Sequence, residues 1–159
     1  MSALPAAVVV ASNRAAAGVY ADETGPLIVE ALRRWGFTCD DAAVVPDGEP
    51  VREAIAAAVA AGARVVLTTG GTGLTPTDRT PEATRPLLDR EVPGLAESIR
   101  AHGVAKGVPT AALSRGLAGI AGQCLVVNLP GSRGGVKDGL AVLEPVLVHA
   151  VEQVVGSDH

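Results

Sequence analysis

A glycine-rich turn directly behind an apolar strand is the feature that most constrains how this chain can fold. Arg64–Thr69 is predicted to be a buried strand, and it runs into the turn Gly70-Gly71-Thr72-Gly73. Open α/β sheets bind ligands beyond the carboxyl ends of their strands, where this turn would lie. Glycine has no Cβ, so the backbone amides of the turn can approach a phosphate closely. The sequence therefore predicts either a phosphate-binding loop, to which the Thr69 and Thr72 hydroxyls add polar groups, or an ordinary tight turn.

Strands and helices alternate along the rest of the chain. The predicted strands are Ala6–Ser12, Ala43–Pro46, Arg64–Thr69, Thr110–Leu113 and Gln123–Leu129. The predicted helices run from Thr24 or Pro26 to Trp35, from Val51 to Gly62, from Thr80 onward, from Pro93 to Gly103, and from Val136 to Val155 with a bend at Pro145. Such alternation is typical of βαβ units, so the sequence predicts an α/β fold with a mainly parallel sheet.

The composition favours one domain with a core of small aliphatic side chains. The chain has 159 residues, of which 48% are hydrophobic, and it contains one Trp, one Tyr and one Phe. Small aliphatic side chains suit helices that pack closely on a parallel sheet. The net charge of −4 and the scarcity of aromatic rings argue against a surface for nucleic acid. We therefore expect residues 1–159 to form a single domain that does not bind nucleic acid.

The sequence also gives an expectation for the cellular compartment. No segment approaches the ~18 uninterrupted apolar residues of a membrane span, and Met1–Pro5 lacks the basic start of a signal peptide. Cys39 and Cys124 have no metal-binding or redox spacing, and the three histidines show no metal-ligand spacing. We expect a cytoplasmic protein with reduced thiols and no membrane association.

Polar or glycine-bearing groups follow four of the predicted strands. In a parallel sheet the carboxyl ends of all four strands lie along one edge, so these groups predict a ligand-binding cleft. The groups are Ser12-Asn13-Arg14, Pro46-Asp47-Gly48, Gly70–Gly73, and Asn128-Leu129-Pro130-Gly131-Ser132.

Two carboxylates accompany these turns. Asp47 precedes Gly48, which by itself is typical of an Asx-turn, whereas Asp78 could be a helix cap, a ribose partner or a magnesium ligand. Both follow strands that are expected to be close neighbours, and magnesium–nucleotide sites commonly use one or two carboxylates together with phosphate oxygens. Covalent catalysis is not expected, because no serine or cysteine is placed as a strained nucleophile with a histidine partner.

Taken together, these segments resemble the molybdopterin-binding domain family. The nearest branch is that of the Mog-type molybdopterin adenylyltransferases, which is related to the G domain of gephyrin. The resemblance covers the chain from Ser12 to the last predicted helix. It is carried by Thr68–Gly73, by Asp78 with Thr80-Pro81-Glu82-Ala83-Thr84, and by Pro93-Gly94, Leu113-Ser114-Arg115 and Asn128-Leu129-Pro130-Gly131.

The resemblance implies a three-layer α/β/α sandwich that forms a trimer and uses ATP and Mg²⁺. It implies transfer of AMP to the terminal phosphate of molybdopterin with release of pyrophosphate, followed by molybdate insertion by a downstream enzyme. By motif, Asp47 and Asp78 match the two acidic positions, catalytic and magnesium-binding, and Thr69–Gly73 match the nucleotide phosphate loop. The residues that would line the cleft for substrate are Ser12, Asn13, Arg14, Ser114, Arg115, Pro130, Gly131 and Ser132.

One alternative keeps the fold and changes the function. It is a protein that binds molybdopterin or nucleotide without efficient adenylylation, in a carrier, regulatory or scaffold role. Two positions also depart from the family pattern, because many relatives carry Asp at the position of Asn13 and Pro at the position of Arg133. Asn13 supplies hydrogen bonds without charge, and Arg133 adds a cation near the expected cleft.

Overall fold

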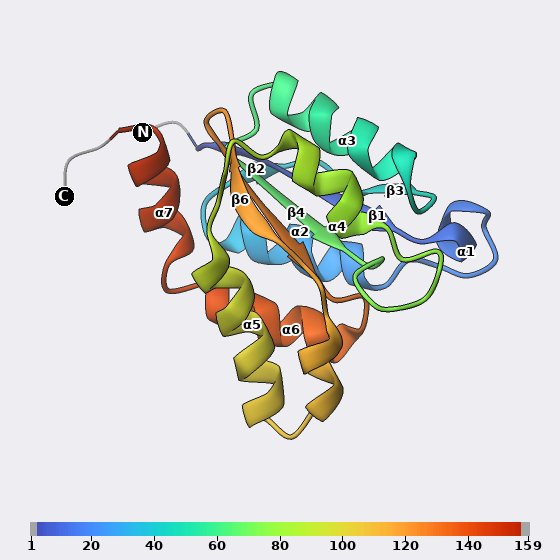
Figure 1. The fold of residues 1–159 in the computed structure, drawn as a ribbon. Helices are drawn as coiled ribbons and strands as arrows, with labels where there is room; N and C mark the ends of the chain where they lie inside the picture. The colour runs from blue at the N-terminus through green and yellow to red at the C-terminus, as the bar shows by residue number, and fades with distance from the viewer. Residues whose placement is uncertain (1–2, 157–159) are drawn as a thin grey trace.

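A computed structural model describes residues 3–156, so both ends of the predicted domain, residues 1–2 and 157–159, lie outside the described residues. Within that range one sheet of seven strands forms the centre, with the order β2-β1-β4-β7-β6-β5 and with β3 also beside β1 (Figure 1). The strands are β1 (Pro5–Ala11), β2 (Thr38–Cys39), β3 (Ala43–Val45), β4 (Val65–Thr69), β5 (Arg90–Glu91), β6 (Ala118–Ala121) and β7 (Cys124–Leu129).

Helices cover both faces of this sheet. They are α1 (Asn13–Ala16), α2 (Thr24–Arg34), α3 (Glu49–Ala60), α4 (Thr80–Thr84), α5 (Pro93–Ala105), α6 (Arg133–Leu143) and α7 (Leu147–Val154), with 3₁₀ turns η1 (Arg85–Leu87) and η2 (Pro109–Leu113). One face packs against α2, α5, α6 and α7, and the other against α3 and α4 (Figure 1). The expected three-layer α/β/α sandwich is confirmed.

The strands that carry the predicted cleft run in the same direction. β1 is parallel to β2, β3 and β4, and β4 is parallel to β7, whereas β6 is antiparallel to β7 and β5 is antiparallel to β6. In the register, Thr69 at the end of β4 lies between Val10 of β1 and Leu129 of β7. The carboxyl ends of these strands therefore meet at one edge of the sheet, as the sequence predicts.

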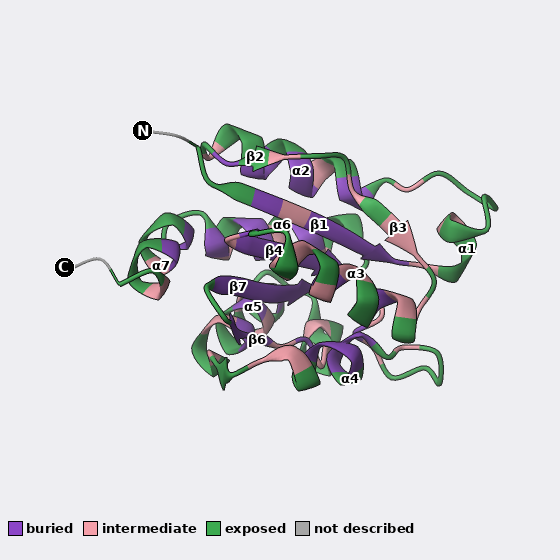
Figure 2. Ribbon diagram, turned by 90° about the horizontal axis from the view of Figure 1, so that it is seen from above, coloured by how far each residue is buried: buried purple, intermediate pink, exposed green. Residues whose placement is uncertain are grey.

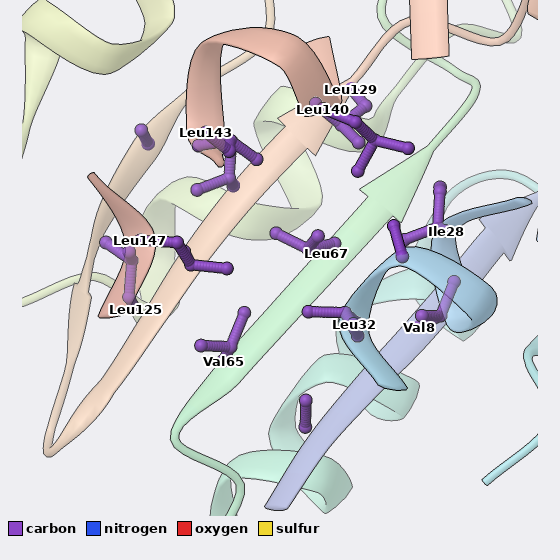
Figure 3. Close-up of a cluster of buried hydrophobic side chains, with 14 of the residues drawn as sticks. Val8, Ile28, Leu32, Val65, Leu67, Leu125, Leu129, Leu140, Leu143 and Leu147 are labelled. Carbon is purple, nitrogen blue, oxygen red and sulfur yellow. The ribbon is translucent and has the colours of Figure 1, made fainter. Parts of the chain in front are cut away.

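Aliphatic side chains fill the space on both faces of the central strands. All residues of β4 and β7 are buried (Figure 2), which is typical of strands covered on two sides. Val65 and Leu67 face the cluster that contains Leu32 of α2 and Leu143 of α6 (Figure 3). Val66 points to the opposite cluster, which includes residues of α3. The alternation follows from the period of two along a strand.

The prediction of a strand at Thr110–Leu113 is wrong, because this segment belongs to the 3₁₀ turn η2. Pro109 opens the turn, and its fixed φ and missing N–H suit a helical first turn better than a paired strand. The strand beside β7 is instead β6, which the sequence reading missed together with β2 and β5. The last two have only two residues each, too few to show a period of two.

The C-terminal helix also differs from the single bent helix predicted from Val136 to Val155. It is two helices, α6 and α7, separated by the segment that holds Pro145, which cannot continue a helix hydrogen-bond ladder. The start of α6 lies earlier, at Arg133, because Ser132 Oγ accepts a hydrogen bond from the Gly135 N–H at 3.0 Å and so caps the helix.

Two further observations concern the predicted compartment. Among residues 3–156, the helices are all too short or too polar to cross a membrane. Cys39 and Cys124 are both free thiols, and burial raises the pKa of Cys124 to about 12, so its thiol stays protonated at neutral pH.

Candidate functional site

Two cavities open on either side of the glycine loop, at the edge where the parallel strands end. The larger, of about 440 Å³, is bounded by the loop, α5, η2 and the start of α6, and its size is typical of small-molecule sites. The smaller, of about 270 Å³, lies beside the end of β1 and the start of α2. Gly131, in the turn after β7, lines both cavities. Two ligands bound in these cavities would therefore lie next to each other.

Most of the predicted site residues line one of these cavities. The larger is lined by Gly71, Thr72, Gly73, Asp78, Ser114, Pro130, Gly131 and Ser132, and the smaller by Ser12, Thr69, Gly70 and Gly131. The predicted residues that line neither are Asn13, Arg14, Asp47 and Arg115. Arg14 lies in the short helix α1, which Ser12 caps by accepting a hydrogen bond from the Ala15 N–H.

The loop after β4 requires glycine at two successive positions. Gly70 and Gly71 have φ values of 88° and 70°, a conformation that residues with a Cβ rarely adopt. A Cβ on Gly70 would also collide with the backbone carbonyl of Ala11, and one on Gly71 with the Thr80 hydroxyl. The backbone of the loop therefore passes closer to β1 and α4 than any other residue type would allow.

Hydrogen bonds hold this loop in place on both sides. Thr80 donates from its hydroxyl to the Gly70 carbonyl at 2.9 Å and from its N–H to the Gly71 carbonyl at 3.0 Å. On the other side, the Thr69 hydroxyl donates to the Pro130 carbonyl at 2.7 Å. The hydroxyl proton of Thr69 is thus engaged within the protein, and so is the Gly70 N–H, which donates to the Leu129 carbonyl at 3.2 Å. Among the described hydrogen bonds of this segment, this leaves Gly71, Thr72 and Gly73, which line the larger cavity, as the donors available to a ligand.

A buried polar network lies beneath the two turns. Asn128 of β7 donates through Nδ2 to the hydroxyls of Thr68 at 2.9 Å and Thr84 at 3.1 Å, while its Oδ1 accepts from the Leu117 N–H at 3.0 Å. Buried polar groups are costly unless they are paired, and here the pairs join β4, α4 and β7. Asn128 belongs to the motif that predicted the cleft, but its side chain does not face a ligand. It links the elements that support the two turns.

The two predicted acidic residues, Asp47 and Asp78, flank the loop. Asp47 follows β3, and its Oδ1 is buried with no hydrogen-bond partner among the described residues. Burial and then the negative charge of Asp78 raise the pKa of the Asp47 carboxyl, and a hydrogen bond from the Asn13 backbone partly offsets them. The Asn13 side chain in turn accepts a hydrogen bond from the Asp47 N–H at 2.9 Å. Asn13 thus helps to position Asp47 without adding charge.

This pair of carboxylates fits a magnesium ion that is shared with phosphate. An unpartnered, buried carboxylate oxygen beside a second carboxylate is unfavourable unless a cation or a proton neutralises it. Within residues 3–156 there is no group of three or more His, Cys, Asp or Glu side chains that could hold a metal by themselves. Magnesium needs only one or two protein carboxylates when substrate oxygens and water complete its shell, so Asp47 and Asp78 suffice.

The guanidinium of Arg115 is bound within the protein. Its Nε donates to the Gly73 carbonyl at 2.9 Å, and its Nη2 donates to the Asp78 carbonyl at 2.9 Å. Glu82 of α4 forms an ion pair with Nη1 at 2.6 Å, which lowers the pKa of the Glu82 carboxyl. These contacts surround the loop that carries Asp78.

The structure adds residues to the cavities that the sequence reading missed. In the larger cavity these are Arg100, which donates from Nη1 to the carbonyls of Ser114 and Gly116, and Asp138 of α6, which pairs with Lys106 at 3.3 Å. In the smaller cavity Tyr20 lies 3.1 Å from the Ser12 hydroxyl. No strand end or glycine turn marks these positions, so the sequence carried no signal of the kind that pointed to the others.

The family now follows from comparison with known proteins. A family described as "Probable molybdopterin binding domain" matches residues 7–149, which include the glycine loop, both carboxylates and the turn after β7. The chain belongs to this molybdopterin-binding domain family.

Individual relatives agree with this assignment. The chain is 37% identical to a molybdopterin adenylyltransferase of Pyrococcus furiosus, over 91% of this chain and 88% of that protein. The solved Mog protein of molybdopterin biosynthesis from Mycobacterium ulcerans is 54% identical, with a TM-score of 0.92 over 96% of this chain and 99% of that one. A molybdenum cofactor biosynthesis bifunctional protein of Synechococcus elongatus is 42% identical over 97% of this chain. The chain spans about half the length of such bifunctional relatives, 48% in this case.

Proposed function

We propose that this protein is a molybdopterin adenylyltransferase of molybdenum cofactor biosynthesis. It would transfer AMP from ATP to the terminal phosphate of molybdopterin and release pyrophosphate. The observation that carries the proposal is the pair of cavities that share Gly131, with the glycine loop between them and the carboxylates of Asp47 and Asp78 next to Gly71 and Gly73 of that loop. A transfer between two substrates needs such adjoining sites, and relatives at 34–38% identity are named for this reaction.

The reaction requires no nucleophile from the protein. An oxygen of the molybdopterin phosphate attacks the α-phosphorus of ATP, a new P–O bond forms, and the bond to the β-phosphate oxygen breaks as pyrophosphate leaves. The chain must hold two anionic substrates in line and stabilise the charge that they share. In this proposal the amides of Gly71, Thr72 and Gly73 hold phosphate oxygens, because the Gly70 N–H donates to the Leu129 carbonyl. Asp47 and Asp78 hold Mg²⁺, which neutralises phosphate charge when it is bound.

The proposal includes the expected setting of the reaction. ATP and Mg²⁺ are the co-substrate and cofactor, the protein is cytoplasmic, and a molybdate-insertion enzyme consumes the product. The homotrimer is what the resemblance implies. Self-association of some kind is supported by the exposed apolar side chain of Val104 at the end of α5, which is 44% exposed, and by Val108 and Leu113, 47% and 51% exposed, which also line the larger cavity. Light scattering on the purified protein measures the assembly directly, and a monomer at micromolar concentration would contradict this part.

The reaction itself can be tested with purified components. Protein, molybdopterin, ATP and MgCl₂ are mixed, and pyrophosphate and adenylylated pterin are followed over time. We expect Asp78→Ala and Asp47→Ala each to lower the rate by about 10²–10³-fold, because each removes charge that holds the reacting groups. Circular dichroism should show that both variants remain folded. Full activity in both variants would overturn the mechanism.

The same experiment separates the alternative function. A carrier or regulatory protein would bind molybdopterin tightly in a titration and yet yield no pyrophosphate with ATP and Mg²⁺. The absence of pterin binding would overturn adenylyl transfer to molybdopterin and the pterin-carrier role, and would leave the cavities to a nucleotide or another ligand.

A further inference from the structure

The Arg115 side chain joins the two ends of the segment 73–78. Its Nε–H donates to the Gly73 carbonyl at the start, and its Nη2 donates to the Asp78 carbonyl at the end, each at 2.9 Å. The Arg115 backbone N–H adds a bond to the Thr72 carbonyl at 2.8 Å. One residue thus spans the whole loop that carries the Asp78 carboxylate.

Little else from outside the segment holds it. Residues 74–77 are all exposed, and Leu74 is 65% exposed. The Asp78 carboxylate accepts a hydrogen bond from the Thr75 N–H at 3.1 Å, which is a contact within the segment itself. Among the hydrogen bonds of the described residues, two side chains from outside the segment reach residues 73–78. Arg79 is adjacent in sequence, so Arg115 is the one that is distant along the chain. Arg115 therefore supplies the long-range side-chain bonds of the segment that carries Asp78.

Arg115 is itself held by Glu82 in the first turn of α4. Glu82 accepts hydrogen bonds from Nη1 at 2.6 Å and from Nη2 at 3.3 Å, a two-pronged pairing that fixes the plane of the guanidinium. With the two carbonyl bonds, four hydrogen bonds engage four of the five N–H groups of an arginine. A neutralised and nearly saturated guanidinium that lines neither cavity is a poor ligand for a substrate anion.

We propose that Arg115 is a positioning residue for Asp78 and not a substrate-binding residue. It braces the loop 73–78 against α4 so that the Asp78 carboxylate stays at the larger cavity, close enough to Asp47 for the two charges to interact. The residues just before it, Leu113 and Ser114, form part of the wall of that cavity. The same short segment therefore shapes the ligand cavity and holds the carboxylate. The structural part stands on contacts alone, and its catalytic consequence rests on the proposed function.

The first test measures the loop and not the reaction. Hydrogen–deuterium exchange of the amides in residues 73–80 is compared in the wild type, Arg115→Lys and Arg115→Met. We expect at least about tenfold faster exchange in both variants, because a lysine ammonium cannot span two carbonyls and a carboxylate as a planar guanidinium does. As a matched control, Arg85→Met breaks the exposed Arg85–Glu91 ion pair of 3.1 Å and should leave this exchange unchanged. Unchanged exchange in Arg115→Met would overturn the proposal.

The second test asks what Arg115 does in catalysis. If it positions Asp78, both Arg115 variants should lower kcat by about 10–100-fold and raise the Mg²⁺ concentration needed for half-maximal rate, with KM for either substrate changed less than about threefold. If Arg115 binds a substrate anion instead, Arg115→Lys should retain kcat, and KM for one substrate should rise in Arg115→Met. That second pattern would overturn positioning. A wild type without adenylylation would sink the proposed function and leave the exchange result intact.

Discussion

Two glycine-bearing turns lie side by side at the same edge of the sheet, and they are built differently. The turn after β7 is organised mainly by local bonds, since Ser132 caps α6 by accepting from the Gly135 N–H and its carbonyl accepts from the Val136 N–H, and one distant side chain, Thr69, adds a bond to the Pro130 carbonyl. The loop after β4 takes its shape from residues farther along the chain, above all Thr80 and Arg115. The first turn is a helix start, whereas the second is a segment held by the rest of the fold.

The difference shows where precision is needed. A helix cap places backbone groups well enough to line a cavity, because its geometry repeats in every helix start. A carboxylate that shares a cation with Asp47 must be held at a particular distance, and four residues of exposed loop cannot do that alone. The loop that carries Asp78 is therefore held by hydrogen bonds from residues that are distant along the chain. Substitutions that affect one turn and spare the other can break or sharpen this contrast.

The largest expected effect comes from a Cβ in the loop after β4. Gly70→Ala would strain a residue at φ 88° and collide with the Ala11 carbonyl, so we expect a loss of about 3–5 kcal/mol in the free energy of unfolding. Gly131→Ala is the matched change in the other turn, where the nearest atom is the Gly70 Cα at 3.2 Å, and should cost about 1 kcal/mol. Urea denaturation measures both. Equal losses would show that the two turns are equally constrained.

The next effect concerns the network beneath both turns. Asn128→Ala leaves the Leu117 N–H without its acceptor and removes the donors to Thr68 and Thr84. We expect a loss of about 2–3 kcal/mol, because buried polar groups lose their partners. Chemical denaturation gives the stability, and hydrogen exchange should show faster opening of both turns together. A change confined to one turn would mean that the network supports that turn alone.

Replacing Asp47 is expected to change stability less than the substitutions above, and to raise stability instead of lowering it. Its pKa is raised in the folded protein from an ordinary value of 3.8, so the folded state binds its proton more tightly than the unfolded state. Stability from this residue therefore falls as pH rises from about 3.8 through the raised pKa, and it stays low above that point. Asp47→Asn should melt at a higher temperature than the wild type at pH 7 without metal, and at the same temperature near pH 3. A lower melting temperature at pH 7 would indicate a favourable partner for the carboxylate.

The smallest effect is expected at an unconstrained glycine of the turn after β7. Gly134 lies in the first turn of α6, and a Cβ there would meet nothing within 4 Å. Gly134→Ala should stabilise the protein by about 0.5 kcal/mol, because alanine restricts the unfolded chain and favours the helix. Thermal denaturation detects this gain. A loss of stability would show that the locally organised turn also needs glycine here.

The long elements could be predicted because their side chains repeat with a clear period. The four strands that end in polar groups were predicted from apolar runs, and their shared edge followed from the parallel sheet. The short strands β2 and β5 have no such repeat, and the segment around Pro109 has apolar residues without the pairing that a strand needs. The two short strands lie at the margins of the sheet, away from the site, whereas η2 forms part of the wall of the larger cavity.

The residues of the site likewise include some that the sequence could predict and some that it could not. Its backbone turns and acidic residues were visible because glycines and carboxylates follow strand ends directly. The partners of Arg115 were not, since Glu82 lies 33 residues away and the Gly73 carbonyl 42 residues away. The resemblance placed Arg115 among substrate-binding residues, and only its surroundings suggest a different task.

The sequence alone therefore determined the long elements and the edge of the sheet at which a ligand can bind, and its motifs carried the resemblance to the family. Local spacing is sufficient for the long elements and for that edge, because periodicity and strand ends are set by neighbours along the chain. The tertiary structure decided which groups are free to meet a ligand and which are already bound. The Thr69 hydroxyl proton is engaged, whereas Asp47 Oδ1 is buried without a partner. The partner of a hydrogen-bonding group is whichever group lies within bonding distance of it in space. These distances are set only when the chain has folded.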